Sequence, residues 1–205
     1  MHGAVASFLA ALALAALLDL APAEASWRGG FGPYGGDRKA VVVDPHDSSL
    51  LYTDSADEAG VWTSRDAGGG WQSTALTFGD SVVAVLDLGD RSRVVAGLSG
   101  RAAGLFWSED AGATWTAVAE LQGQDVLLLA ADPYRGDHCL AVVRPSATEP
   151  HDFFRTTDGG ATWQALDPGV ETVIGEPFTN GDVAFDPDQP DLLYLAVNAY
   201  PFKVS

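Results

Sequence analysis

An eight-residue signature occurs three times in this chain and constrains its fold more than any other feature. Each copy follows the pattern Ser/Thr-x-Asp-x-Gly-x-x-Trp. The copies span residues 64–71, 108–115 and 156–163. Their aspartates are 44 and 48 residues apart. A repeat of roughly 40–50 residues indicates a propeller or a solenoid, in which every repeat is one supersecondary unit.

The signature has the chemistry of a tight connection between two strands. An Asp followed two positions later by Gly favours a turn, because the carboxylate accepts nearby backbone N–H groups and Gly adopts positive φ without strain. The Ser or Thr hydroxyl can bond to the same turn, and the Trp ring starts the returning strand and covers the turn. We expect structural roles, rather than acid/base or metal roles, for Ser64, Asp66, Gly68, Trp71, Ser108, Asp110, Gly112, Trp115, Thr156, Asp158, Gly160 and Trp163. Asp110→Ala is expected to lose turn bonds and weaken the fold.

Short apolar runs between turn signals fill the remainder of each repeat, without a helical period. Strands are predicted at 40–43, 50–53, 60–64, 71–76, 81–86, 93–98, 103–108, 115–119, 125–130, 139–144, 152–156, 163–166, 181–185 and 192–197. Four strands per repeat form the blade of a propeller. The predicted fold is an all-β propeller of four-stranded antiparallel blades at about 40–76, 81–119, 125–166 and, in part, 181–205.

A second marker follows the first predicted strand of each repeat. Asp44, Asp132 and Asp186 each precede a Pro, and Asp87 occupies the same place without one. The Pro stops the hydrogen-bond ladder and the Asp caps the turn. The fourth repeat has no signature before residue 205. The sequence therefore predicts about three and a half blades, whereas closed propellers have roughly 4–8. We expect either a fragment of a longer product or closure by self-association, and favour the fragment.

The signature resembles the Asp-box, or bacterial neuraminidase repeat. This repeat occurs in sialidases, sortilin-type receptors, xyloglucanase-type glycoside hydrolases and photosystem II assembly propellers. In those families the box lies on the outer part of a blade, away from the central site. The resemblance implies a β-propeller and does not imply catalysis by the box.

Residues 1–25 have the features of a signal peptide. The apolar run from Ala4 to Leu18 is short for a membrane span, and small residues at Ala23 and Ala25 suit a signal peptidase. We place cleavage after Ala25. The remaining segment, 26–205, is predicted to be secreted or periplasmic, with no stable membrane insertion after cleavage.

The charge and the cysteine content exclude several classes of partner. A formal net charge of −17 disfavours nucleic acid and anionic membranes. Cys139 is the only cysteine, so no intramolecular disulfide can form, and its apolar surroundings predict a buried thiol. The histidines at 46, 138 and 151 lack metal-ligand spacing. We expect no metal and no cofactor.

Two function classes remain open. A non-catalytic module that binds a protein or a glycan needs only the repeats, and we favour it. The alternative is the N-terminal part of a xyloglucanase-type glycoside hydrolase, a class that uses two carboxylates across a cleft. Resemblance to that family nominates Asp57 as a catalytic carboxylate, with its partner in a second propeller. For Asp57 we favour a polar loop residue.

Three other propeller classes fit the sequence less well. A sialidase would carry an Arg-Ile-Pro motif, and Arg144-Pro145 lacks the Ile. A sortilin-type receptor would add a cysteine-rich module and a membrane span. An assembly factor would present a basic patch, whereas the 11 Lys and Arg residues are scattered along the chain.

Overall fold

The computed structural model describes residues 40–54, 60–77, 79–146, 151–166 and 181–197. All structural statements below refer to this part of the chain. The predicted signal peptide at 1–25 and the candidate Asp57 lie outside it.

Four antiparallel sheets, which we call blades 1 to 4, follow one another along the chain. Blade 1 contains β1 (Val41–Val43), β2 (Leu51–Thr53), β3 (Trp62–Ser64) and β4 (Gln72–Ser73). Blade 2 contains β5 (Ser81–Asp87), β6 (Ser92–Leu98), β7 (Gly104–Ser108) and β8 (Thr116–Ala117). Blade 3 contains β9 (Asp125–Ala131), β10 (Cys139–Arg144), β11 (Asp152–Thr156) and β12 (Gln164–Leu166). Blade 4 contains β13 (Gly181–Phe185) and β14 (Leu193–Val197).

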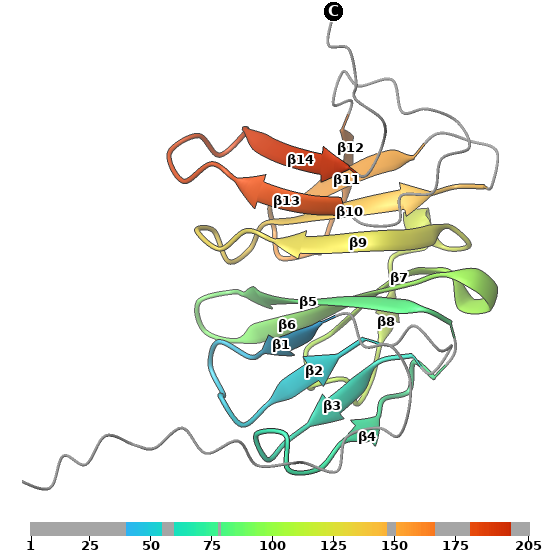
Figure 1. Ribbon diagram of the computed structural model, residues 1–205, viewed down its shortest axis with the longest axis vertical. Coiled ribbons are helices and arrows are strands. Elements are labelled where there is room, and N and C mark those ends of the chain that lie inside the picture. The colour runs from blue at the N-terminus through green and yellow to red at the C-terminus, as the bar shows by residue number, and fades with distance from the viewer. Residues whose placement is uncertain (1–39, 55–59, 78, 147–150, 167–180, 198–205) are drawn as a thin grey trace, which may run out of the picture.

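The blades are stacked face to face in chain order. Figure 1 shows them from blade 1 in blue to blade 4 in red. The first strands lie side by side, because β1 contacts β5 and β5 contacts β9. Repeated four-stranded sheets packed in this way form a β-propeller. The predicted fold class, an all-β propeller with an incomplete set of blades, is confirmed.

The core consists of the layers between neighbouring blades. Val83 and Val85 on β5 pack in the cluster shared with blade 1, whereas Ala84 and Leu86 pack in the cluster shared with blade 3. Successive residues of a strand point to opposite faces. Blade 2 is covered on both faces, which explains why β5 is continuously apolar instead of alternating.

The outermost strands differ from the prediction. They begin one residue after the Trp of each signature, and β4 and β8 are shorter than predicted. Beyond β4 the pairing becomes irregular: Thr74 N donates to the Val61 carbonyl and Val61 N donates to the Leu76 carbonyl. After β8 the chain turns into a short 3-10 helix, Ala119–Leu121. A second one, Gly100–Ala102, follows β6. Such short helices carry no periodic sequence signal.

Candidate functional site

Each signature copy forms the same hydrogen-bonded connection, which we call a repeat turn (residues 64–71, 108–115 and 156–163). In the second copy, Ser108 Oγ donates to Asp110 Oδ1 at 2.8 Å and accepts a bond from Gly112 N at 2.9 Å. Thr114 N donates to the same carboxylate oxygen at 2.8 Å. The first and third copies repeat all three bonds through Ser64, Asp66, Gly68 and Gly70, and through Thr156, Asp158, Gly160 and Thr162.

The repeat turns require two consecutive left-handed residues. The signature glycines Gly68, Gly112 and Gly160 have φ of 90°, 81° and 83°. The residues before them are left-handed as well, with φ of 56° at Ala67, 58° at Ala111 and 70° at Gly159. The sequence predicts positive φ for the glycines and gives no sign of it at the two alanines.

The hydroxyl, and not the carboxylate, is the buried polar group of each turn. The exposed fractions are 1% for Ser64, 2% for Ser108 and 1% for Thr156. The three aspartates are exposed. Each Trp is half-buried, and Trp115 Nε1 donates to the Gly112 carbonyl at 3.1 Å.

Hydrogen bonds within the turns hold the carboxylates in their ionised form. The hydroxyl and the N–H of Thr114, together with the Ser108 hydroxyl, lower the pKa of Asp110 to about 2. The Gly70 N–H and the Ser64 hydroxyl lower the pKa of Asp66. The first turn has Gly70 where the other two have Thr114 and Thr162, whose hydroxyls both donate to the box carboxylate. Asp66 therefore lacks one bond that Asp110 and Asp158 receive.

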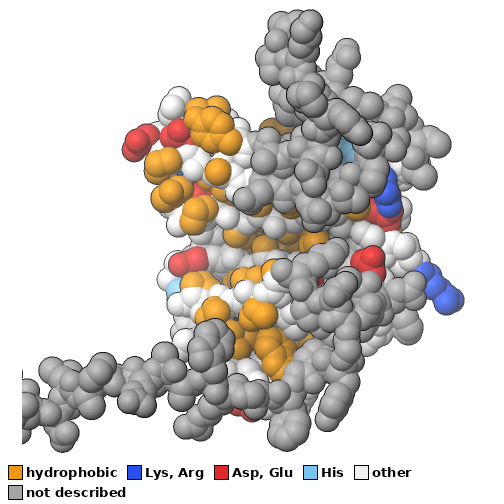
Figure 2. All heavy atoms as spheres, viewed as in Figure 1, with side chains coloured by type: hydrophobic (Ala, Val, Ile, Leu, Met, Phe, Trp, Pro, Cys, Tyr) orange, Lys and Arg blue, Asp and Glu red, His pale blue; other side chains and the backbone are white. Residues whose placement is uncertain are grey.

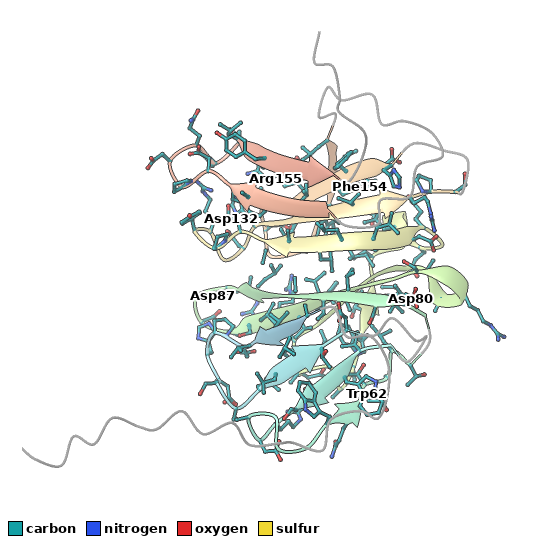
Figure 3. The ribbon with its side chains drawn as sticks, viewed as in Figure 1. Trp62, Asp80, Asp87, Asp132, Phe154 and Arg155 are labelled. Atoms are coloured by element: carbon teal, nitrogen blue, oxygen red, sulfur yellow. The ribbon has the colours of Figure 1, made fainter. Side chains whose placement is uncertain are left out.

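A second set of aspartates caps the connection between the first two strands of each blade. We call these connections the Asp turns. Asp44, Asp87, Asp132 and Asp186 each accept a backbone N–H from the residue two positions later, at 2.8–3.0 Å. The predicted capping role of these residues is confirmed. Figure 3 shows Asp87 and Asp132 on the same edge of the stack, opposite Asp80.

Arginines connect each described blade to the next one. Arg65 Nη2 donates to the Ala111 carbonyl at 3.2 Å, and Arg93 Nη1 donates to the Gly159 carbonyl, the equivalent atom one blade further on. Arg93 also pairs with Glu109 and lies 4.5 Å from the centre of the Trp107 ring. Sequence reasoning missed these contacts, because the guanidinium and its carbonyl belong to different repeats.

Blade 3 uses two further arginines at its junction with blade 4. Arg135 bonds to the carbonyls of Asp186 and Pro187, and Arg155 pairs with Asp191 at 3.0 Å. Figure 3 shows Arg155 beside the β13–β14 hairpin. The arginine side chains at these junctions therefore bond to groups of the neighbouring blade.

Among the described residues, two grooves between neighbouring blades are lined by charged side chains. The first, about 410 Å³, lies between blades 1 and 2 and is lined by His46, Tyr52, Arg65, Arg91, Glu109 and Asp110, among others. The second, about 380 Å³, lies between blades 2 and 3 and includes Arg93 and Asp158. His46 Nε2 lies 2.8 Å from Asp87 Oδ1 and joins the Asp turns of blades 1 and 2. Tyr52 is only 1% exposed, so its ring is not available to stack on a sugar.

The pKa values of several described titratable groups depart from their ordinary values. Burial raises the pKa of the Cys139 thiol to about 12, and the predicted burial of this thiol is confirmed. Wherever the pKa of a described carboxyl clearly departs from its ordinary value, the pKa is lowered. This group comprises Asp47, Asp66, Asp87, Asp110, Asp158 and Glu109. A glycosidase general acid requires the opposite shift.

No three described His, Cys, Asp or Glu side chains come together as metal ligands would. Among the described residues, no helix has the length and apolarity needed to span a membrane.

Comparison with solved structures identifies similar propellers, although no family model and no curated protein matches the sequence. An ancestral GH74 enzyme is 24% identical over 78% of this chain and 22% of that chain, with a TM-score of 0.61. A GH74 enzyme from Niastella koreensis is 19% identical over 76% of this chain and 24% of that chain, with a TM-score of 0.53. YCF48 from Cyanidioschyzon merolae is 19% identical over 65% of this chain and 38% of that chain, with a TM-score of 0.43.

The two GH74 matches agree with the class of fold. The chain spans less than a quarter of the length of the two GH74 enzymes. At such identities the likeness shows a shared propeller architecture and assigns no activity to this chain.

Proposed function

We propose that this chain is an exported propeller module that binds a protein or a glycan without changing it chemically. The observation that carries the proposal is geometric: the repeat-turn carboxylates are bonded to hydroxyls and N–H groups of their own turns. The shifted carboxyls of the described residues are held ionised by turns or arginines, as in Asp110 and Glu109. Hydrolysis of a glycosidic bond needs one carboxyl kept protonated, and carboxylates bonded within their own turns are not placed to supply it. The repeat turns then serve as architecture that supports a binding surface.

The distribution of charge supports a neutral or basic partner rather than a nucleic acid. The chain carries a formal net charge of −17, which repels phosphate backbones. The arginines at the blade junctions are bonded to carbonyls and carboxylates of their own chain. They do not form a continuous basic surface.

Glycoside hydrolysis is the second candidate function. The likeness to two GH74 enzymes favours it, and the sequence nominates Asp57 as the carboxylate to test. In this case the chain would supply one carboxylate, and the partner carboxylate would come from a second propeller.

A combined hydrolysis and binding experiment separates the two functions. The full gene product that contains this chain is incubated with xyloglucan, and new reducing ends are measured beside its Asp57→Asn variant. Binding is followed by retardation of both proteins in gels that contain the same polysaccharide. The binding proposal predicts no new reducing ends, and a glycan ligand would retard the parent and the variant equally. Hydrolysis by the parent that Asp57→Asn abolishes would overturn the proposal in favour of the second candidate.

A further inference from the structure

The two ends of the blade stack expose apolar side chains at positions that are buried in the interior blades. Val41 and Val43 on β1 are 59% and 51% exposed. Tyr194 on β14 is 57% exposed. Figure 2 shows hydrophobic side chains at the surface over the β13–β14 hairpin.

The register of the strands shows what Val41 and Val43 are equivalent to. Val43 pairs with Leu51, which pairs with the signature residue Ser64. Val85 pairs with Val94, which pairs with the signature residue Ser108. Val43 therefore has the position of Val85 in blade 2, and Val41, two residues earlier on the same face, has the position of Val83.

These equivalent valines are buried because a blade precedes them. Val83 and Val85 are 6% and 9% exposed and pack against blade 1. On β1 the intervening residue, Val42, packs toward blade 2, so Val41 and Val43 point the other way. We call the surface formed by Val41 and Val43 the leading face.

At the other end of the stack, in blade 4, the Asp turns show which residues of the earlier blades are equivalent to Tyr194. Asp186 N donates to the Leu192 carbonyl, as Asp44 N donates to Leu50 and Asp132 N donates to His138. Two residues further on, Tyr194 therefore corresponds to Tyr52 in blade 1 and to Leu140 in blade 3. Those two residues are each 1% exposed.

The equivalents of Tyr194 are covered by the blade that follows. Tyr52 packs in the cluster with Val83, Val85 and Val94 of blade 2. Tyr194 lies on the same face as its exposed cross-strand partner, Ala184. We call the surface formed by Ala184 and Tyr194 the trailing face.

We propose that the trailing face of one copy of this chain docks on the leading face of a second copy. The apolar clusters lie at the junction of blades 1 and 2 and at the junction of blades 2 and 3. At both junctions, the face of one blade that corresponds to the trailing face packs against the face of the next blade that corresponds to the leading face. The leading face and the trailing face at the two ends of the stack are therefore equivalent to surfaces that pack against each other in the interior. A pair with two such junctions closes on itself, as heterologous contacts do when the rotation permits. Each described copy contributes three four-stranded blades and the two-stranded blade 4. A pair therefore has six four-stranded and two two-stranded blades, at the upper end of the roughly 4–8 blades of closed propellers.

The native mass of the purified chain, measured by light scattering at physiological ionic strength, tests this proposal. The expected value is twice the mass of one chain, which is 21.4 kDa for residues 1–205 and less once residues 1–25 are removed. Val43→Asp and Tyr194→Asp each place a charge on one of the two faces and should each give monomers. Tyr134→Asp is the matched control, because Tyr134 is 59% exposed but belongs to an Asp turn and to neither face. It should remain a dimer. A parent chain that is a monomer across a concentration series, or that forms open polymers, overturns the proposal.

Thiol cross-linking keeps the test decisive if a charged variant fails to fold. Val43→Cys and Tyr194→Cys variants are mixed and treated with a short bifunctional maleimide. Cys139 is fully buried and should not react. Head-to-tail docking predicts cross-linked products that contain one copy of each variant. Cross-linking within Val43→Cys alone would show that two leading faces meet, which contradicts the proposal.

Discussion

Within each repeat turn, the buried hydroxyl is the side-chain group whose removal should lower the free energy of unfolding most. Ser108 is 2% exposed, and its oxygen accepts the N–H of Gly112, which is buried as well. Ser108→Ala leaves that N–H without an acceptor, at a cost of about 1–3 kcal/mol. Ser108→Thr restores the hydroxyl, as Thr156 does in the third turn, and should unfold close to the parent in urea. Asp110→Ala should lower the melting temperature less, because water can reach the groups that it exposes.

Equal urea midpoints for Ser108→Ala and Ser108→Thr would contradict this account of the hydroxyl. The difference in burial between the hydroxyl and the carboxylate could not be predicted from the sequence. The spacing of Ser, Asp and Gly predicts which groups share a turn. It does not say which of them is covered, because the neighbouring blade decides burial.

Gly70 is a position where a substitution should stabilise the first repeat turn. Thr114 and Thr162 hold the same place in the other turns, and both donate to the carboxylate through the side chain. An added Cβ at Gly70 would lie 3.4 Å from Asp66, an ordinary contact, and this Gly is not left-handed. Gly70→Thr should raise the melting temperature, since replacing Gly at a compatible position stabilises a fold by about 0.4–1 kcal/mol through the unfolded chain. Gly69→Thr is the control: its Cβ would lie 2.9 Å from Asp66, and it should destabilise the chain.

At the level of elements, the close approach of blades 2 and 3 depends on glycine. An added Cβ at Gly97 on β6 would lie 2.3 Å from Val126 Cγ1 on β9. Gly97→Ala should therefore destabilise the chain by about 1–3 kcal/mol, the usual range for overpacking a filled core. Gly70→Ala meets no such contact and serves as the control. Differential scanning calorimetry of both variants would contradict the blade packing if their melting temperatures agreed.

The inner strands were largely predictable from sequence, whereas the lengths of the outermost strands and the contacts between blades were not. Turn signals and β-branched runs bracket a strand such as β10, which was predicted at its observed bounds, 139–144. The junction contact of Arg93 with Gly159 joins residues 66 positions apart and has no local signal. The solvent exposure of Tyr194 also has no local sequence signal, because it depends on which blade lies beside this residue.

For the whole molecule, the lowered carboxyl pKa values predict acid sensitivity in a narrow range. A group whose folded pKa lies below its unfolded value, about 3.9 for Asp, contributes stability above that value and loses it as the pH falls through the folded pKa. For Asp110 the folded pKa is about 2. The free energy of unfolding in urea should thus change little from pH 7 to about 4.5 and fall between about 4 and 2. A constant value down to pH 2 would mean that these carboxylates are not bonded in solution.

The repeated signature builds the blades through turns in which each hydroxyl accepts a glycine N–H. Amide hydrogen exchange at Gly68, Gly112 and Gly160, measured by NMR, tests it at all three repeats together. We predict slow exchange at each, because their N–H groups bond to hydroxyls at 2.8–2.9 Å. In Ser108→Ala, exchange at Gly112 should become fast while the other two remain protected. Fast exchange at these glycines in the parent chain would contradict the claim.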